Sequence, residues 1–403
     1  MTTRLTIAYA APGHRLVPTA GPTRNMLCLA DALSELADVT LVFRRAPEPV
    51  AGGLRVLAIE PGVWDDDAAD DVAQRGLNPI EHLAYMRRLR TFAESQGHAF
   101  DVVLEKGWRL SGTLCAAFTR LGVPGVLVEN DVRPWWEPIR SPRTLVKYGS
   151  HLVADAVSRR HTRQVPIIAE TDELKAMLVQ RGAVADRVEV IGLGVDHRRF
   201  HPRDQGDARR TLGLDVSVPV FVYVGAMDKY HDLAPVIAGL ATASPDTELH
   251  VVGDGNGRAE CERLAAGLGT AVRFHGRVPH ASVPTYIATA DACIAAYREH
   301  TFVGDGVPFS TLKVPEYMAC GRAVVGNAAG QARALLEHGI SACLFPNDVE
   351  SWSRFFADVP SREHLAEMGR AAAKAAEVLT WERTAARYFD VCQAVAATRG
   401  RRP

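Results

Sequence analysis

A lysine and a glutamate three residues apart carry the clearest chemical potential in this chain. They are Lys313 and Glu316 in the stretch FSTLKVPEYMACGRAVVG, residues 309–326. An ammonium group can neutralise a phosphate, and a carboxylate can accept two hydrogen bonds from a vicinal diol. Together they suit a nucleotide, with its phosphates on the lysine and its ribose on the glutamate. The alternative is a surface ion pair worth a few tenths of a kcal/mol. The two interpretations are equally good from these residues alone.

The element that must position this pair is a helix. Pro315 has no N–H group and fits only the first turn, so the helix should begin near Ser310 or Thr311, and either residue can cap it. The backbone N–H groups and partial positive charge of a helix N-terminus favour a phosphate there, and Lys313 would add a full positive charge. Gly321 should end the helix before the sheet resumes at RAVVG.

Short apolar runs alternate with amphipathic stretches along the whole chain, which is typical of parallel strands joined by crossover helices. The strand candidates are RLTIAYA, VTLVF, LRVLAI, FDVVLE and PGVLVEN in the first half, and VPVFVYVG, ELHVVGDG, VRFHG, DACIAAY, RAVVG and ACLF in the second.

The alternation of apolar runs and amphipathic stretches is interrupted once, in the glycine-, proline- and charge-rich segment VEVIGLGVDHRRFHPRDQGDARRTLGL. With 403 residues, the chain is long enough for two domains of about 200 residues each. We predict an α/β protein with two doubly wound, Rossmann-like domains over 1–200 and 201–384, and a C-terminal helix of about 385–403 that packs back on the first domain. Such domains bind ligands at the carboxyl ends of their strands, so the two should face a central cleft.

Composition excludes several classes of protein. Lys plus Arg number 46 and Asp plus Glu number 47, and no basic stripe interleaved with aromatics indicates a nucleic-acid partner. The seven cysteines form no CxxC pair and are typical of buried thiols in a reducing cytosol. No secretory signal and no apolar run of about 20 residues is present, so we expect a soluble cytoplasmic protein, at most peripheral to a membrane.

Three further motifs favour structural roles. GDGNGR at 253–258 lacks the third glycine of a dinucleotide fingerprint, because Arg258 stands there, and we expect a tight turn. The acidic run WDDDAADD at 64–71 is more typical of a solvated loop than of a metal site. The closing RGRRP should be a disordered tail.

The chain resembles glycosyltransferase family 4, the retaining enzymes of the GT-B fold. The family reads SPxKLxEYMAxGxPVV in one branch, and this chain reads STLKVPEYMACGRAVV. Further matches follow in the family's order: GPTRNMLCLADALSELADVTLVF, VIGLGVDHRRFHP, VGAMDKY, LHVVGDG, VRFHGRV, ADACIAAY, GQARALLEHGISACLFPND and TWERTAARYF. The resemblance therefore covers nearly the whole chain.

The resemblance implies a nucleotide-sugar co-substrate, UDP- or GDP-linked, with no other cofactor and no metal. Glu316 would bind the donor ribose, the segment from Ser310 to Lys313 the diphosphate, and Arg277 with Val278 the base. The donor-binding set implied in this way is Gly21, Gly225, Arg277, Val278, Ser310, Thr311, Leu312, Lys313 and Glu316.

Three departures from the family pattern alter these expectations. Pro308 stands where the family has a second, sugar-sensing glutamate, which indicates an unusual donor sugar. The phosphate-binding arginine and lysine of the second domain appear as Ala226 and His231. Asn130 replaces a histidine at the end of PGVLVEN; it can orient a sugar hydroxyl but cannot act as a general base.

The resemblance also implies the mechanism. Lys313 and His231 would stabilise the negative charge on the departing nucleoside diphosphate, and attack from the face it leaves would retain the anomeric configuration. The catalytic set is Lys313, Glu316, Asn130 and His231. No carboxylate pair suggests a glycosidase-like double displacement.

The acceptor side is harder to interpret. Asp131, Trp135 and Trp136 follow the strand that ends near Asn130, and the tryptophans could stack on a planar acceptor, although packing is slightly favoured. A membrane-contact patch is possible but a solvated helix is favoured for Arg140, Arg143 and Lys147. The acceptor class stays open between a polysaccharide, a lipid and a small natural product, and the oligomeric state is not predicted.

Two alternatives to an active glycosyltransferase remain. A nucleotide-sugar epimerase would need acid and base groups around the sugar, which the sequence does not reveal. A nucleotide-sugar-binding or scaffold protein that has lost catalysis is compatible with Ala226, Pro308 and Asn130. Release of nucleoside diphosphate in the presence of donor and acceptor distinguishes these classes.

Overall fold

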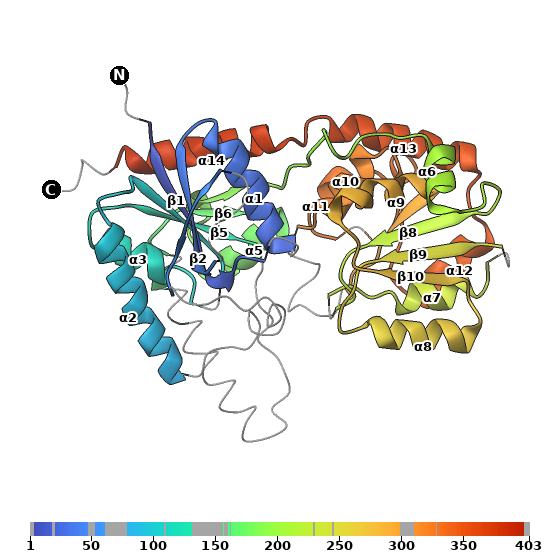
Figure 1. The fold of residues 1–403 in the computed structure, drawn as a ribbon, viewed down its shortest axis with the longest axis horizontal. Coiled ribbons are helices and arrows are strands. Elements are labelled where there is room, and N and C mark those ends of the chain that lie inside the picture. Colours follow the sequence, from blue (N-terminus) through green and yellow to red (C-terminus); the bar gives the residue numbers. More distant parts are fainter. Residues whose placement is uncertain are drawn as a thin grey trace. The chain divides into compact units, whose positions relative to one another are not determined.

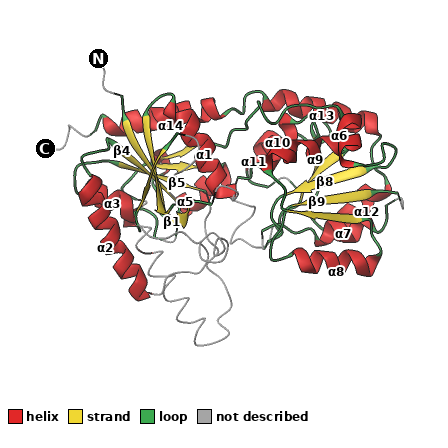
Figure 2. Cartoon of the chain, viewed as in Figure 1, coloured by secondary structure: helices red, strands yellow, loops and turns green. Residues whose placement is uncertain are grey.

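The computed structural model describes residues 4–17, 21–46, 53–60, 79–108, 110–130, 156, 160–161, 163–228, 230–243, 246–298, 310–327 and 329–398. It forms two compact units, one of Met1–Gly192 with Trp381–Pro403 and the other of Leu193–Thr380 (Figure 1). Each unit is a parallel sheet with helices on both faces (Figure 2). The chain thus changes unit a few residues before the predicted boundaries of 200 and 384.

The first unit contains a seven-stranded sheet in the order β3-β2-β1-β4-β5-β6-β7. Its strands are β1 (Thr6–Arg15), β2 (Asp38–Arg45), β3 (Arg55–Ala58), β4 (Val102–Lys106), β5 (Gly125–Glu129), β6 (Ile167–Ala169) and β7 (Val188–Val190). Helices α2 (Pro79–Gln96), α3 (Thr113–Thr119) and α5 (Asp172–Gln180) lie on one face. Helices α1 (Gly21–Ser34) and α14 (Trp381–Ala396) pack against each other and on the sheet.

Strands β6 and β7 were not among the predicted strands. Each has three residues, and an apolar run of this length seldom stands out from a loop. The residues of β7 belong to the stretch that we assigned to the break between domains. In the structure they pair with β6 and form an edge of the first sheet.

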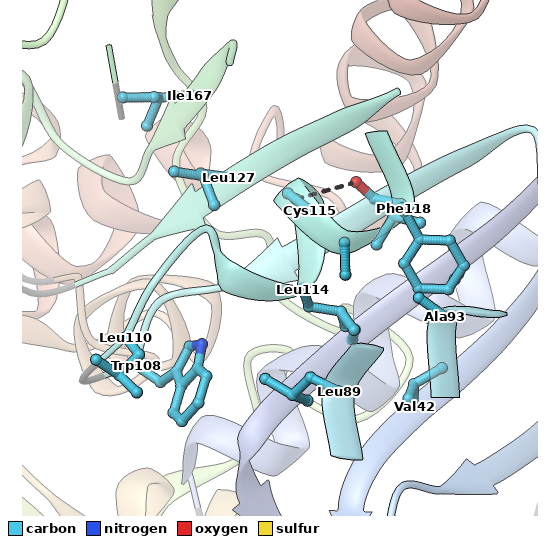
Figure 3. Close-up of a cluster of buried hydrophobic side chains, with 14 of the residues drawn as sticks. Val42, Leu89, Ala93, Trp108, Leu110, Leu114, Cys115, Phe118, Leu127 and Ile167 are labelled. Atoms are coloured by element: carbon cyan, nitrogen blue, oxygen red, sulfur yellow. Dashed lines mark hydrogen bonds between the residues drawn. The ribbon is translucent and has the colours of Figure 1, made fainter. Parts of the chain in front are cut away.

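The core of the first unit lies between this sheet and helices α2, α3 and α5. Leu89 and Ala93 of α2 meet Leu114 and Phe118 of α3 within it (Figure 3). The turn before α3 is held by a buried carboxylate: Glu105 accepts hydrogen bonds from the Cys115 backbone N–H at 2.7 Å and from the Trp108 indole at 2.7 Å. This carboxylate does what a side-chain cap does at other helices.

The second unit contains a six-stranded sheet in the order β10-β9-β8-β11-β12-β13. Its strands are β8 (Val220–Val224), β9 (Glu248–Val252), β10 (Val272–Gly276), β11 (Ala292–Ala295), β12 (Ala323–Gly326) and β13 (Ala342–Leu344). All six coincide with predicted strands. The order reverses between β8 and β11, and open α/β sheets bind ligands at such a switch point, beyond the carboxyl ends of the strands.

Helices cover both faces of the second sheet (Figure 1). One face carries α7 (Ala234–Leu240), α8 (Arg258–Leu268) and α12 (Val349–Ala357). The other carries α6 (Gln205–Leu212), α9 (Val283–Thr289), α10 (Lys313–Ala319) and α13 (Arg362–Ala376). The short elements are η2 (Ala185–Arg187) in the first unit, and η3 (His280–Ser282) and α11 (Gln331–Leu335) in the second.

Backbone meets backbone where β8 and β9 end. Gly253 has φ +138°, and a Cβ there would lie 1.9 Å from the carbonyl oxygen of Gly225. A side chain is therefore excluded at this position. The GDG motif makes the expected tight turn between β9 and α8, and it serves the packing of two strand ends.

A buried ion pair joins the start of β8 to helices α6 and α9. The Asp291 carboxylate accepts hydrogen bonds from Arg209 Nη2 at 2.9 Å and from the Val220 backbone N–H at 2.8 Å. Arg209 is 1% exposed, and its Nε donates to the carbonyl of Thr289 at the end of α9. Basic side chains commonly bind helix C-terminal carbonyls in this way.

Removing this carboxylate should destabilise the second unit strongly. We expect Asp291→Ala to lower the free energy of unfolding by about 3–5 kcal/mol, because Arg209 would remain buried without its counter-charge. Urea unfolding measures the change. Asp207→Ala is the matched control, since Asp207 pairs with Arg210 on the exposed face of α6 and its loss should cost below about 1 kcal/mol. Equal effects of the two substitutions would contradict the assignment.

Candidate functional site

Helix α10 begins later than the sequence predicts. Its first residue is Lys313, and Leu312 precedes it without a side-chain cap. Ser310 and Thr311 do not cap the helix: the Ser310 hydroxyl bonds to Gln331 Oε1, and the Thr311 hydroxyl lies 2.8 Å from the Tyr297 hydroxyl. The predicted caps therefore tie the preceding segment to other loops. With seven residues, α10 offers little dipole for a phosphate, so Lys313 is the main cationic group here.

The Lys313 side chain is buried rather than paired on the surface. Its exposure is 6%, and Nζ donates to the Tyr223 hydroxyl at 2.9 Å. The ammonium lies 4.1 Å from the centre of the Tyr223 ring and 5.5 Å from that of Tyr297, at the distances of cation–π contacts. A Cβ on Gly225 would lie 2.7 Å from Nζ, so the glycine leaves room for this side chain. The surface ion-pair interpretation is wrong.

Burial changes the charge of Lys313. It lowers the lysine pKa from 10.5 to about 7, and the nearby carboxylates of Asp228 and Glu316 offset only part of the effect. The ammonium therefore loses its proton near neutral pH, whereas the sequence predicted a full positive charge. An anion that arrived beside Nζ would favour the protonated form.

His231 lies in the same cluster, which also contains Tyr223, Tyr297 and Asp228. Its ring centre is 5.7 Å from that of Tyr297, and its Nδ1 lies 2.9 Å from Asp228 Oδ1. Burial, together with the Lys313 charge, lowers the His231 pKa to about 4. The imidazole is thus neutral at pH 7 and adds a polar contact rather than a second positive charge.

Glu316 shares the buried face of α10 with Lys313, one turn further on. It is 8% exposed, and its Oε1 lies 3.6 Å from His280 Nε2. A buried carboxylate needs polar partners, and its position three residues from Lys313 places both groups on one side of the helix. The spacing in the sequence did find this pair, but it did not reveal His280.

Arg277 and Val278, the predicted base contacts, come directly after β10. Arg277 is exposed and Val278 is half-buried. Gly276 before them has φ +67°, a left-handed conformation in which the chain turns sharply. His280 follows two residues later, so the same loop reaches Glu316.

The predicted residues of the first unit lie at the carboxyl end of its sheet. Asn130 directly follows β5 and is half-buried, and Gly21 is the first residue of α1. Several predictions fall outside the described residues: Pro308, the acceptor candidates Asp131, Trp135 and Trp136, the basic set Arg140, Arg143 and Lys147, the acidic run 64–71 and the tail 399–403.

A buried charged group that the sequence did not predict lies near Asn130. Lys106, the last residue of β4, is 1% exposed, and burial lowers its pKa while Glu170 and Glu129 raise it. Asn25 of α1 donates to Glu170 Oε1 at 3.2 Å. Lys106 and Glu129 end parallel strands, and Glu170 directly follows one. Residues at these positions gather at the carboxyl edge of the sheet, so the predicted strands could have drawn attention to the first two.

Within the described ranges, no group of three or more His, Cys, Asp or Glu side chains is arranged to hold a metal ion. Among the helices in those ranges, none has the length and apolar character needed to cross a bilayer.

Known proteins share both the sequence pattern and the fold. The family described as glycosyl transferases group 1 matches residues 218–358. D-inositol 3-phosphate glycosyltransferase 2 of Catenulispora acidiphila is 30% identical over 95% of this chain and 92% of its own. D-inositol 3-phosphate glycosyltransferase of Thermobispora bispora is 27% identical over 75% of this chain and 72% of its own.

Two solved structures have the same fold. Sucrose-phosphate synthase from Thermosynechococcus elongatus superposes with a TM-score of 0.76 at 19% identity, covering 98% of this chain and 100% of its own. Anabaena HepE in complex with UDP-glucose superposes with a TM-score of 0.71 at 18% identity, covering 97% of this chain and 100% of its own. The architecture is the GT-B fold, as the sequence predicts.

The burial of Lys313 predicts a pH-dependent cost to stability. Between pH 7 and 10.5 the unfolded chain holds a proton that the folded chain has lost, so stability rises with pH in this window. Lys313→Met should therefore raise the free energy of unfolding by about 1–3 kcal/mol at pH 6, with a gain that shrinks toward pH 10. Urea unfolding at several pH values measures it. The exposed Lys374→Met is the control, and a Lys313→Met protein that is less stable at pH 6 would contradict the burial cost.

Proposed function

Because this chain belongs to glycosyltransferase family 4, we propose that it moves a glycosyl unit from a uridine diphosphate sugar to a hydroxyl group of a small polyol acceptor. It is a glycosyl-transferring enzyme that uses a nucleotide-sugar donor. The choice of uridine rests on HepE, whose structures contain UDP and UDP-glucose. The choice of a polyol rests on the two relatives, which are named for inositol 3-phosphate.

The observation that carries the proposal is the buried face of α10. Lys313 and Glu316 are 6% and 8% exposed and lie beyond the carboxyl ends of the strands, next to the point where the strand order reverses. An ammonium beside a carboxylate on one buried face suits a nucleoside diphosphate, with phosphate oxygens at Nζ and ribose hydroxyls at the carboxylate.

In this proposal Lys313 stabilises the leaving group. When the glycosidic bond to the diphosphate breaks, negative charge develops on the phosphate, and a preorganised cation in a water-poor site stabilises it strongly. The diphosphate also favours the protonated lysine. His231 is neutral and donates or accepts a hydrogen bond there, while Asp228 fixes its ring.

We assign Asn130, which follows β5 of the first unit, to the acceptor side. Asn130 would orient a hydroxyl of the sugar or acceptor, because an amide can both donate and accept. We propose attack on the face that the diphosphate leaves, with retention of configuration and with a phosphate oxygen taking the acceptor proton. The donor sugar is expected to be unusual for the family, because Pro308 stands at the family's second glutamate position.

Release of nucleoside diphosphate tests the function directly. The protein is incubated with UDP-glucose, UDP-N-acetylglucosamine, UDP-galactose or GDP-mannose, each with and without inositol phosphates. We expect UDP release from at least one uridine donor that rises when the acceptor is added, and a product whose anomeric proton has the configuration of the donor. Binding of donors without release from any pair would contradict catalysis and favour a nucleotide-sugar-binding protein.

Glu316 should carry most of the ribose recognition. We expect Glu316→Ala to weaken UDP binding about 10- to 100-fold, which is the loss of roughly one or two charge-assisted hydrogen bonds. Isothermal calorimetry with UDP measures the change. Glu367→Ala, an exposed glutamate on α13, should bind UDP like the wild type. An unchanged affinity in Glu316→Ala would remove the ribose assignment.

A further inference from the structure

His280 lies between an arginine and the buried carboxylate of Glu316. Its Nδ1 lies 2.8 Å from Arg199 Nη1, and its Nε2 lies 3.6 Å from Glu316 Oε1. We propose that His280 is a positioning residue, which holds the Glu316 carboxylate in the orientation that receives the ribose hydroxyls of the donor. This inference rests on the proposed function.

The Arg199 contact fixes the tautomer of His280. A guanidinium has donors and no acceptor, so the imidazole nitrogen that it meets must be unprotonated. The hydrogen of the neutral ring is then on Nε2, the atom that faces Glu316. Arg199 thereby makes His280 a hydrogen-bond donor toward the Glu316 carboxylate. The imidazole can fill this role without carrying a positive charge.

Both sides of His280 are held in place. The Phe200 ring meets the imidazole edge to face, with ring centres 5.3 Å apart. Arg199 is anchored in turn, because its Nε lies 3.7 Å from Asp196 Oδ2 and its carbonyl accepts a hydrogen bond from Arg203 Nη2 at 3.1 Å. The imidazole is half-buried, with 22% of its side chain exposed, so its rotation is limited by neighbours.

The distance between His280 Nε2 and Glu316 Oε1 leaves room for the two side chains to move closer when the donor binds. At 3.6 Å it exceeds an ordinary hydrogen bond, and polar contacts in empty sites commonly shorten once a ligand is bound. The terminal torsion of a glutamate side chain is broad. A donor on one oxygen restricts that torsion and leaves the remaining lone pairs for a vicinal diol.

The place of His280 in the chain gives the contact a second consequence. Gly276, Arg277 and Val278 precede it in one loop, and Arg277 with Val278 are the proposed base contacts. One short loop therefore reaches both the base and the carboxylate that binds the ribose. Positioning by this loop couples recognition of the two halves of the nucleoside.

The test separates ribose recognition from the rest of the nucleotide. UDP and 2′,3′-dideoxy-UDP, which lacks the hydroxyls, are titrated by calorimetry into the wild type, His280→Ala and His280→Gln. We expect His280→Ala to weaken UDP binding about 5- to 20-fold and to leave the dideoxy analogue within about twofold of wild type, because only the contact through Glu316 is disturbed. His280→Gln keeps an N–H donor near the position of Nε2 and should restore most of the affinity.

Control variants test whether a loss of affinity comes from a disturbed fold rather than from the lost His280 contact. His364→Ala changes an exposed histidine on α13 and should leave both affinities unchanged. Thermal unfolding of each variant checks the fold, and Arg199→Met, which releases the tautomer, should show a smaller loss in the same direction as His280→Ala.

The outcomes separate this inference from the function it rests on. A wild-type protein that binds neither UDP nor its analogue would overturn the proposed function and the inference with it. A wild type that prefers UDP over the analogue, with His280→Ala retaining that preference, would overturn the inference alone. Equal weakening of both nucleotides in His280→Ala would also overturn it, because His280 would then act on the base or the diphosphate.

Discussion

The buried ammonium of Lys313 is the constraint on which the rest of the second unit's carboxyl edge depends. A lysine in this environment needs a hydrogen-bond acceptor, aromatic faces and space. Tyr223 supplies the first two from β8, Tyr297 supplies a second ring after β11, and Gly225 supplies the space. Gly225 also lies at the close approach of β8 and β9, where a Cβ on Gly253 would lie 1.9 Å from the Gly225 carbonyl oxygen. The burial of the Lys313 side chain therefore depends on residues from several strands.

The reversal of strand order explains why so many separate loops contribute. Chain segments after β8, β10 and β11, together with the start of α10, all end on the same side of the sheet. Each brings one function: a ring for the ammonium, a neutral histidine fixed by Asp228, or an imidazole directed at Glu316. Because parallel strands place their carboxyl ends together, residues far apart in sequence come together at this edge without any long excursion of the chain.

The sequence predicts the elements of this arrangement better than their contacts. Apolar runs identified every strand of the second sheet, including the three-residue strand β13, whereas the equally short strands β6 and β7 were missed. Spacing identified Lys313 with Glu316, because helical geometry is local. The partners of these residues could not be found in that way: Lys313 and Tyr223 are separated by 90 positions, and nothing in either segment indicates that they meet. The lowered pKa of Lys313, about 7, could not be predicted either, because it depends on burial, which only the assembled fold decides.

The first unit is made of two chain segments that are far apart in the sequence, and this affects the order in which its parts are synthesised. Helix α14 packs on α1 and on β4 and β5, yet it is made from the last residues of the chain. During synthesis the strands of the first sheet are all made once β7 has been translated, but the part of the sheet over β4 and β5 that α14 contacts stays uncovered until α14 is made. The second unit is continuous and has all its strands and helices by Thr380. The first unit is thus translated first and completed last, because its final helix follows the whole of the second unit in the chain.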